Sequence, residues 1–389
     1  MEEILKYNFD EIINRVGTQC AKYDGAKTIN PYLSDDFIPM WVADMDFATP
    51  DVVLQSMKAI IDQRILGYSF GLSQDYYDAV INWMSSHHDM DVKKEEIVTS
   101  CGVVMAMKQA VLHLTKAGDN VLIQTPSYRP FYNSAKDNQR NVLFNRLIYK
   151  DGQYQIDWQD FEEKVKQCKL FFLCSPHNPT GRVWTKEELQ KMGEICFANG
   201  VYVFCDEIHH DIVRCNQKMI SMKSLFAQQP LLITATSPSK TFNLAGNNHS
   251  NIIVNDLEIA QKWRDSRCCG GNTLISAQAC QTAYEKCDDW LQQLKVYLDE
   301  NINFVKEYFQ KHLEKAVVCD CQATYLVWVD LSAYNKSDLE LRKSISSGGV
   351  YLEYGDEFVD NAEGFARINV ACPKSVLQRA LERIVKSLN

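Results

Sequence analysis

The sequence predicts an α/β protein: a mostly parallel sheet with helices on both faces, and a smaller α+β domain built from the chain termini. Two observations support this prediction. Strand-like and helix-like segments alternate from about residue 100 to about residue 270, as parallel strands joined by crossover helices require. Beyond residue 287 the order changes to one long helix followed by mixed strands and helices. The chain therefore divides into a large and a small unit.

Thr49-Pro50-Asp51 predicts the start of the first helix, with a capping hydroxyl, a proline at the first helical position and an early acid. This helix ends before Gly67, and its apolar positions are Val52, Val53, Met57, Ile60 and Ile61. A second helix is expected from Ser100 to about Lys116. Gly118-Asp119 then turns the chain into a strand at residues 121–123.

A long amphipathic helix is predicted from Asp288 to about Lys311, and it could link two domains. One side of it is apolar, at Trp290, Leu291, Leu294, Tyr297, Leu298, Ile302 and Val305. Strands at 325–329 and 365–370, a helix near 336–347 and a final helix follow. We expect residues 1–48 to join the small domain, residues 49–287 to form the large domain, and residues 288–389 to form the C-terminal small domain.

Composition narrows the class of protein. The chain has 389 residues, of which 46% are hydrophobic, so it can bury a substantial core. Its formal net charge of −9 argues against nucleic acid or an anionic membrane surface as the main partner. No apolar run approaches the roughly 18 residues of a membrane helix, and the N-terminus has no basic segment followed by an apolar stretch. We expect a cytoplasmic protein.

The cysteines and histidines do not predict a metal site. In the cytoplasm the 14 cysteines stay mostly reduced. Cys268-Cys269 and Cys319-x-Cys321 lack the paired spacing of a zinc site. His209 and His210 are adjacent, so their side chains face different ways on a strand or helix, and a polar pocket or surface position explains them better than metal ligation.

Three polar residues follow three successive strand-like runs. Asn178 lies in the turn after residues 169–174, Asp206 ends the run 201–205, and Lys240 follows the run 231–236. Ligands of open α/β sheets bind at the carboxyl ends of parallel strands. A lysine on a rigid element, partly desolvated and near groups that hold a phosphate, is suited to forming a Schiff base. An amide, a carboxylate and an amine at one sheet edge therefore predict a pyridoxal phosphate site.

At these residues the chain resembles the fold-type I pyridoxal-phosphate enzymes of the class I/II aminotransferase superfamily. Within that superfamily it is most similar to the carbon–sulfur β-lyases, the cystathionine β-lyase and cysteine desulfhydrase group often called MalY/PatB. The resemblance spans nearly the whole chain, and the segments that carry it are Trp41–Phe47, Asp206–His209, Ser239–Gly246 and Arg367–Asn369.

The resemblance implies a role for each ring-binding residue. Asp206 faces the pyridine nitrogen and keeps it protonated, so that electrons from the substrate α-carbon drain into the ring. Asn178 donates a hydrogen bond to the phenolic oxygen, and Tyr128 stacks on the ring. His209 stands where aminotransferases often carry a tyrosine that contacts the same oxygen, which leaves its role open.

The phosphate is expected to bind neutral donors. Gly102, Val103 and Val104 present main-chain N–H groups at the start of a helix, and Ser237 and Ser239 add hydroxyls. Many relatives carry an arginine about eight residues after the lysine, but this chain has Asn247-Asn248 there. Tyr68 resembles the tyrosine that reaches the phosphate of the neighbouring subunit, so the resemblance implies a homodimer.

Arg367 lies in a strand-like segment, where a buried guanidinium requires an anion. An amino-acid α-carboxylate, held by two parallel hydrogen bonds, would satisfy it, and the resemblance implies this role with Asn178 also at the substrate. The predicted reaction is α,β-elimination of cystathionine, L-cysteine or a related thioether, with Lys240 as anchor and base. Two alternatives stay open: an aminotransferase using the same residues, and a regulatory protein that binds a partner.

Overall fold

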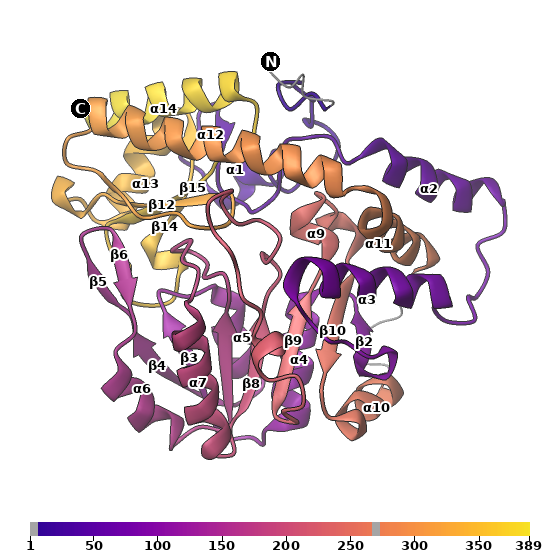
Figure 1. The fold of residues 1–389 in the computed structure, drawn as a ribbon. Coiled ribbons are helices and arrows are strands. Elements are labelled where there is room, and N and C mark those ends of the chain that lie inside the picture. The colour runs from indigo at the N-terminus through magenta and orange to yellow at the C-terminus, as the bar shows by residue number, and fades with distance from the viewer. Residues whose placement is uncertain (1–6, 267–272) are drawn as a thin grey trace.

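The computed structural model describes residues 7–266 and 273–389 and contains two main sheets, one at the centre of each unit (Figure 1). Cys268 and Cys269 lie outside the described residues. The larger sheet has the strand order β2-β10-β9-β8-β7-β3-β4. Its strands are β2 (Ile97–Ser100), β3 (Asn120–Thr125), β4 (Asn141–Arg146), β7 (Leu170–Cys174), β8 (Tyr202–Asp206), β9 (Leu232–Thr236) and β10 (Ser250–Val254).

The larger sheet is mostly parallel, as predicted. Pairs β9·β8, β8·β7, β7·β3 and β3·β4 are parallel, and β10 runs antiparallel to both of its neighbours. Every residue of β7 is buried, because helices cover both faces of this sheet. Neighbouring parallel strands therefore end at one edge, and that edge faces the small unit.

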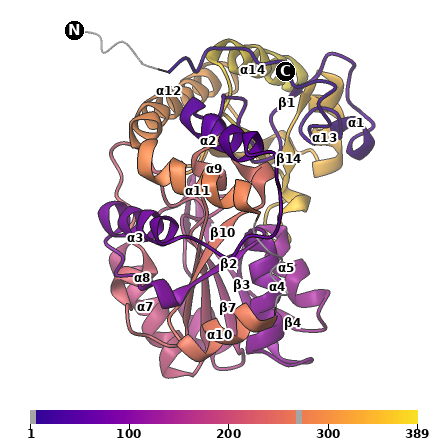
Figure 2. The same cartoon turned by 90° about the vertical axis from the view of Figure 1, so that its right-hand side faces the viewer.

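Successive residues of each central strand pack into two different cores. Phe171 and Leu173 pack with α6 (Trp158–Val165) and α7 (Lys186–Ala198), on one face of the sheet. Phe172 packs on the opposite face with α4 (Val103–Leu114), α5 (Arg129–Lys136) and α10 (Leu257–Ser266). Figure 2 shows the strands between α7 on one side and α4 and α5 on the other. These two cores fix the orientation of the sheet edge.

The smaller unit is a four-stranded antiparallel sheet with the order β11-β12-β15-β14, flanked by helices. Its elements are β11 (Val317–Val318), β12 (Leu326–Asp330), α13 (Asp338–Ser347), β13 (Val350–Tyr351), β14 (Glu353–Tyr354), β15 (Phe365–Asn369) and α14 (Lys374–Leu388). β1 (Ile38–Pro39) pairs in parallel with β13, so the N-terminal segment lies against this unit. The predicted long helix is α12 (Asp288–His312), whose apolar side packs into the core of the small unit.

The remaining elements lie between these units or beside the large sheet. They are α1 (Ala26–Ile29), α2 (Asp51–Asp62), α3 (Gln74–His88), the hairpin β5 (Ile148–Lys150) and β6 (Gln153–Gln155), α8 (Met222–Leu225), α9 (Pro238–Thr241) and α11 (Leu274–Lys286). Among the described residues, no helix is long and apolar enough to cross a bilayer.

One predicted helix cap and one predicted helix start were wrong. Pro50, not Thr49, is the N-cap residue of α2, because the Thr49 hydroxyl donates instead to the main-chain oxygen of Asn243 at 3.2 Å. Ser100 ends strand β2, and the second helix begins three residues later at Val103. Gly102 between them has φ +107°, a conformation that side chains other than glycine's rarely adopt.

Candidate active site

Asn178, Asp206 and Lys240 meet at the carboxyl edge of three adjacent parallel strands. Asp206 is the last residue of β8, Asn178 follows β7, and Lys240 lies in α9 directly after β9. All three side chains line one cavity of about 340 Å³, inside the roughly 300–1,000 Å³ range of small-molecule sites. The adjacency of β7, β8 and β9 in the sheet thus places these groups together.

The cavity gathers eleven of the twelve predicted site residues: Gly102, Val103, Val104, Tyr128, Asn178, Asp206, His209, Ser237, Ser239, Lys240 and Arg367. Asn248, which replaces the arginine of many relatives, also lines it. Tyr68 is the exception, because its side chain is fully exposed in the segment between α2 and α3.

The Lys240 amine is partly neutral at physiological pH. Burial lowers its pKa to about 8, although the charges of Asp44 and Asp206 oppose this shift. Its Nζ atom donates a hydrogen bond to the main-chain oxygen of Ala43 at 2.6 Å. An amine with these properties can act as a nucleophile and as a base.

The Asp206 carboxyl, which lines the same cavity as this amine, is buried. Burial raises its pKa to about 7, and a hydrogen bond from the main-chain N–H of Ile208 at 3.1 Å and the charge of Lys240 oppose the rise. Because burial disfavours the ionised carboxylate, a cationic partner would stabilise it strongly. A protonated ring nitrogen in the cavity would be such a partner.

His209 and Tyr128 are neutral groups of the same cavity. Burial, and then the positive charges of Lys240 and Arg367, hold the pKa of His209 well below its ordinary value. Its Nδ1 atom is buried and has no hydrogen-bond partner in the described structure. Burial raises the pKa of Tyr128 to about 12, so its hydroxyl stays protonated. The cavity therefore offers neutral hydrogen-bonding groups beside its charged residues.

The part of the cavity next to the first turns of α4 and α9 contains hydrogen-bond donors that suit an anion. The first turn of α4 has N–H groups without intrahelical partners, and the glycine before it brings the main chain close. Ser237 caps α9 by accepting from the N–H of Ser239, and its hydroxyl donates to the main-chain oxygen of His249 at 2.6 Å. The free donors here are the neutral N–H groups of α4, because the Ser237 hydroxyl already uses its one hydrogen on His249.

Arg367 lies at the side of the cavity next to the small unit. Its Nη1 atom donates to Oδ1 of Asn178 at 2.8 Å, and Nη2 donates to the main-chain oxygen of Trp41 at 3.1 Å and contacts Glu353. Its Nε atom is buried without a partner. The guanidinium is thus held in place with one donor still unsatisfied.

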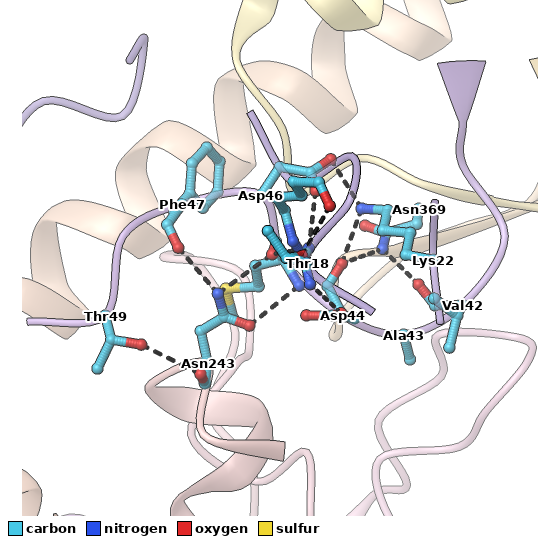
Figure 3. A network of polar contacts seen from close by, with 12 residues as sticks. Thr18, Lys22, Val42, Ala43, Asp44, Asp46, Phe47, Thr49, Asn243 and Asn369 are labelled. Carbon is cyan, nitrogen blue, oxygen red and sulfur yellow. Dashed lines mark hydrogen bonds and ion pairs between the residues drawn. The ribbon is translucent and has the colours of Figure 1, made fainter. Parts of the chain in front are cut away.

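Residues 41–47, which we call the 41–47 loop, contribute Val42 and Ala43 to the lining of the cavity. Figure 3 shows the polar contacts of this loop. Asn369 donates to the main-chain oxygens of Val42 and Asp44 at 2.7 and 2.8 Å, on either side of Ala43. Asn243 donates to the oxygens of Met45 and Phe47. These amides fix the loop, and so they fix the oxygen that accepts from Lys240.

Three ion pairs, made by Lys22 and Arg15, hold the same loop. Lys22, which is 1% exposed, pairs with Asp46 at 2.8 Å and also donates to the main-chain oxygen of Asp44. Arg15 pairs with both Asp44 and Asp46. The N-terminal segment therefore contributes a wall of the cavity.

Sequence reasoning missed the roles of Ala43 and Glu353. The Ala43 contact uses a main-chain oxygen, so no residue type could have revealed it. Glu353 is the single acid in the otherwise apolar and aromatic run 350–354, and that isolated charge was an available signal. It lies on β14, directly opposite Arg367 on β15.

His209 and His210 do face different environments, as their adjacency predicted. His209 lines the cavity, whereas the ring of His210 stacks on His88 at 3.9 Å. The Nε2 atoms of His88 and His210 lie 2.7 and 3.3 Å from the carboxylate of Asp211. Asp211 also accepts from the hydroxyl of Thr241, the neighbour of Lys240, so this cluster supports α9 from outside the cavity.

Comparison with known proteins places this geometry in a family. The model of the family "Aminotransferase class I and II" matches residues 35–384. Cystathionine beta-lyase PatB of Bacillus subtilis is 40% identical over 98% of this chain and 100% of its own. Protein MalY of Escherichia coli is 28% identical over 98% of this chain and 99% of its own.

A solved structure has the same fold. The pyridoxal-phosphate-bound C–S lyase from Staphylococcus hominis superposes with a TM-score of 0.93 at 38% identity, covering 98% of each chain. The likeness extends over both units and the N-terminal segment.

Proposed function

Because the chain belongs to the class I and II aminotransferase family, we propose that it is a pyridoxal-phosphate-dependent carbon–sulfur β-lyase. The substrates would be cystathionine, L-cysteine or related thioethers, and the products pyruvate, ammonia and a thiol or hydrogen sulfide. The observation that carries the proposal is the meeting of Asn178, Asp206 and Lys240 with Arg367 in one cavity. The similarity to the relatives named as lyases supports elimination over transamination.

The described residues fit the cofactor. The unpartnered Nδ1 atom of His209 is a buried polar atom that gains from a hydrogen-bonding ligand. Lys240 would hold the cofactor covalently, Asp206 would pair with its ring nitrogen and Asn178 would bind its phenolic oxygen, while Tyr128 stacks on the ring. The phosphate would bind the N–H groups of residues 102–104 and the hydroxyls of Ser237 and Ser239.

Pyridoxal phosphate, when bound, supplies an electron-withdrawing ring that accepts the electron pair left at the substrate α-carbon. Arg367, with Asn178, binds the substrate α-carboxylate and so fixes the orientation of the α-carbon. The Lys240 amine removes the α-proton, and its lowered pKa of about 8 leaves a useful neutral fraction near neutral pH. Asp206 keeps the opposite side of the site negative.

A contact of this chain also holds the Lys240 amine while it is free. The main-chain oxygen of Ala43 accepts a hydrogen bond from Nζ at 2.6 Å. That hydrogen bond holds Nζ on the cavity side of α9. The 41–47 loop also covers the reacting groups and limits the entry of water.

The active unit of the proposal is a homodimer. The segment that carries Tyr68 is rich in exposed apolar side chains: Ile65, Leu66, Tyr68 and Phe70 are 81%, 68%, 109% and 110% exposed. Side chains of this kind gathered on one surface segment are typical of an interface. A second copy of the chain would cover them and receive Tyr68 at its phosphate site. Sedimentation or light scattering tests the oligomeric state.

We also propose that the enzyme acts in the cytoplasm. Of the cysteines that the structure describes, the eleven other than Cys287 have free thiols, as a reducing compartment favours. Cell fractionation followed by immunodetection tests the location.

Incubating the purified protein separately with cystathionine, cysteine, and an amino acid plus 2-oxoglutarate tests the reaction. Pyruvate from the first two substrates, with sulfide from cysteine, is the expected result. New amino acid formed from 2-oxoglutarate without pyruvate would instead assign the chain to the aminotransferases. Absorbance near the visible edge in the purified protein tests for the bound cofactor, and a colourless protein that stays inactive after cofactor addition would favour a binding role.

A further inference from the structure

Glu353 and Arg367 are neighbours by strand register, and both line the cavity. β14 pairs antiparallel with β15, and the two residues lie directly opposite each other. Cross-strand partners project from the same face of a sheet, so the backbone brings the carboxylate to the guanidinium. The side chain of Arg367 is 3% exposed and that of Glu353 is 20% exposed.

The hydrogen-bond donors of Arg367 leave no free pair for a carboxylate. A guanidinium holds a carboxylate at two points, either through Nη1 and Nη2 or through Nε and Nη2. Both modes use Nη2, which has two hydrogens. One of them donates to the main-chain oxygen of Trp41, and Glu353 takes the other. A substrate α-carboxylate can therefore be gripped at two points only after one partner has left Nη2.

Glu353 is the partner able to leave. The Trp41 oxygen belongs to the main chain, and the indole of Trp41 is fixed by stacking on Tyr351 at 4.7 Å and by donating to the main-chain oxygen of Lys22 at 3.0 Å. The Glu353 carboxylate is attached through rotatable bonds. Burial raises its pKa despite the opposing charge of Arg367, so the ion pair does not fully compensate its desolvation.

We propose that Glu353 is a built-in competitor of the substrate α-carboxylate for Arg367, and that amino-acid binding displaces it. The unpartnered Nε atom then joins Nη2 in the two-point grip. This inference rests on the proposed function and adds a specificity determinant to it. The displaced carboxylate stays beside the bound substrate, where it repels a second acidic group. The site thus favours amino acids whose side chains carry no net negative charge over those with a net acidic side chain. Cystathionine belongs to the favoured group, because a second ammonium group balances its second carboxylate.

Calorimetric titration of the holoenzyme with 3-(methylthio)propionate tests the proposal. This probe keeps the carboxylate and the thioether but lacks the amino group, so it binds without reacting. The variants are Glu353→Gln and Glu353→Ala, and thermal unfolding checks that both fold. The control is Asp356→Asn, because Asp356 is a half-exposed carboxylate that pairs with Arg342. The alcohol analogue of the probe, which has no carboxylate, is the control ligand.

Removal of the Glu353 charge is expected to tighten binding of the probe about tenfold. In the variants the probe carboxylate can bind Arg367 without first displacing the Glu353–Arg367 ion pair. Asp356→Asn and the alcohol should show the affinity of the parent. Glutarate should bind the parent more weakly than the probe, and Glu353→Gln should narrow that gap. Unchanged or weaker binding of the probe by both folded variants would overturn the proposal, and an unchanged gap would overturn the selectivity. Because binding needs no turnover, these results are independent of whether the chain produces pyruvate.

Discussion

The Nζ atom of Lys240 and the main-chain oxygen of Ala43 lie 2.6 Å apart, although 197 positions separate the two residues in the sequence. The same oxygen accepts from the hydroxyl of Tyr325 at 3.1 Å. The N-terminal segment, the large unit and the small unit therefore meet at one atom beside the reactive amine. Any change that moves the 41–47 loop changes the environment of Lys240.

Lys240→Ala is expected to abolish pyruvate formation, with a fall of at least about 10³-fold, because one amine serves as anchor and base. Some cofactor should still bind through the other contacts of the cavity. A pyruvate assay and an absorption spectrum check this prediction. Lys58→Ala, which replaces an exposed lysine of α2, is the control. Turnover at the parent rate in Lys240→Ala would contradict the assigned role.

Asp206→Asn should stabilise the cofactor-free protein at pH 8. The pKa of Asp206 is raised to about 7 by burial, from an ordinary value of 3.8, so the ionised carboxyl destabilises the folded state. Protonation of Asp206 stabilises the folded protein. This contribution is fully present below pH 3.8 and is lost as the pH rises through 7. The variant should gain up to a few kcal/mol at pH 8, and the gain should shrink toward pH 5. Denaturant unfolding of both cofactor-free proteins at the two pH values measures it. An equal difference at both pH values would exclude this cause.

Arg367→Lys should raise the KM for cysteine about 100-fold, because a lysine cannot reproduce the two-point grip of a carboxylate. Binding of cysteamine, which is cysteine without its carboxylate, should change little. Steady-state kinetics and a cysteamine titration provide the two measurements. Arg342→Lys is the matched control, since Arg342 pairs with Asp356 outside the cavity. Equal losses for cysteine and cysteamine would show that the variant damages the site in general.

Two inactive variants should complement each other if Tyr68 crosses to the neighbouring subunit. A mixed dimer of Tyr68→Ala and Lys240→Ala has one site with both native residues. After random exchange of subunits, half of the dimers are mixed, so about a quarter of the sites regain activity. Unfolding and refolding an equimolar mixture, followed by a pyruvate assay, tests this. If the mixture stays as inactive as its components, Tyr68 acts within its own chain or has no role.

Lys22→Met should destabilise the protein by about 2–3 kcal/mol, because it leaves the buried carboxylate of Asp46 with only Arg15 as its counter-ion. Lys27→Met is the control. Lys27 pairs with the fully exposed Asp35, and loss of such a surface pair is expected to change stability much less than loss of the Lys22 pair. Denaturant unfolding gives both values. Equal effects would show that burial of the Lys22 pair does not matter to stability.

Much of the sheet edge could be predicted from the sequence, because buried parallel strands are apolar runs and the residues that follow them meet at one edge. Asn178, Asp206 and Lys240 were found in this way. The cap at Thr49 and the helix start at Ser100 were wrong because tertiary contacts decided them. The Thr49 hydroxyl donates to the main-chain oxygen of Asn243, and Ser100 extends a strand that pairs with β10. The division of the chain near residues 48 and 288 stays a prediction.

The partner of Arg367 could not be predicted, because it depends on strand register in the small unit. An isolated acid in residues 350–354 was visible, but its position opposite Arg367 follows from the antiparallel pairing of β14 and β15. The hydrogen bond from Lys240 to Ala43 involves a main-chain oxygen, which every residue type has. Tyr68 was assigned by resemblance alone, and its exposed side chain leaves that role to the proposed dimer.

The strand β15, which carries Arg367, lies far downstream of α4 and of β8, the strand that ends at Asp206. During translation this wall of the site therefore leaves the ribosome after those parts of the large unit. The nascent large unit can fold first, and its ligand edge then stays uncovered until β15 has emerged. We expect loading of the vitamin B6 coenzyme to wait for that moment.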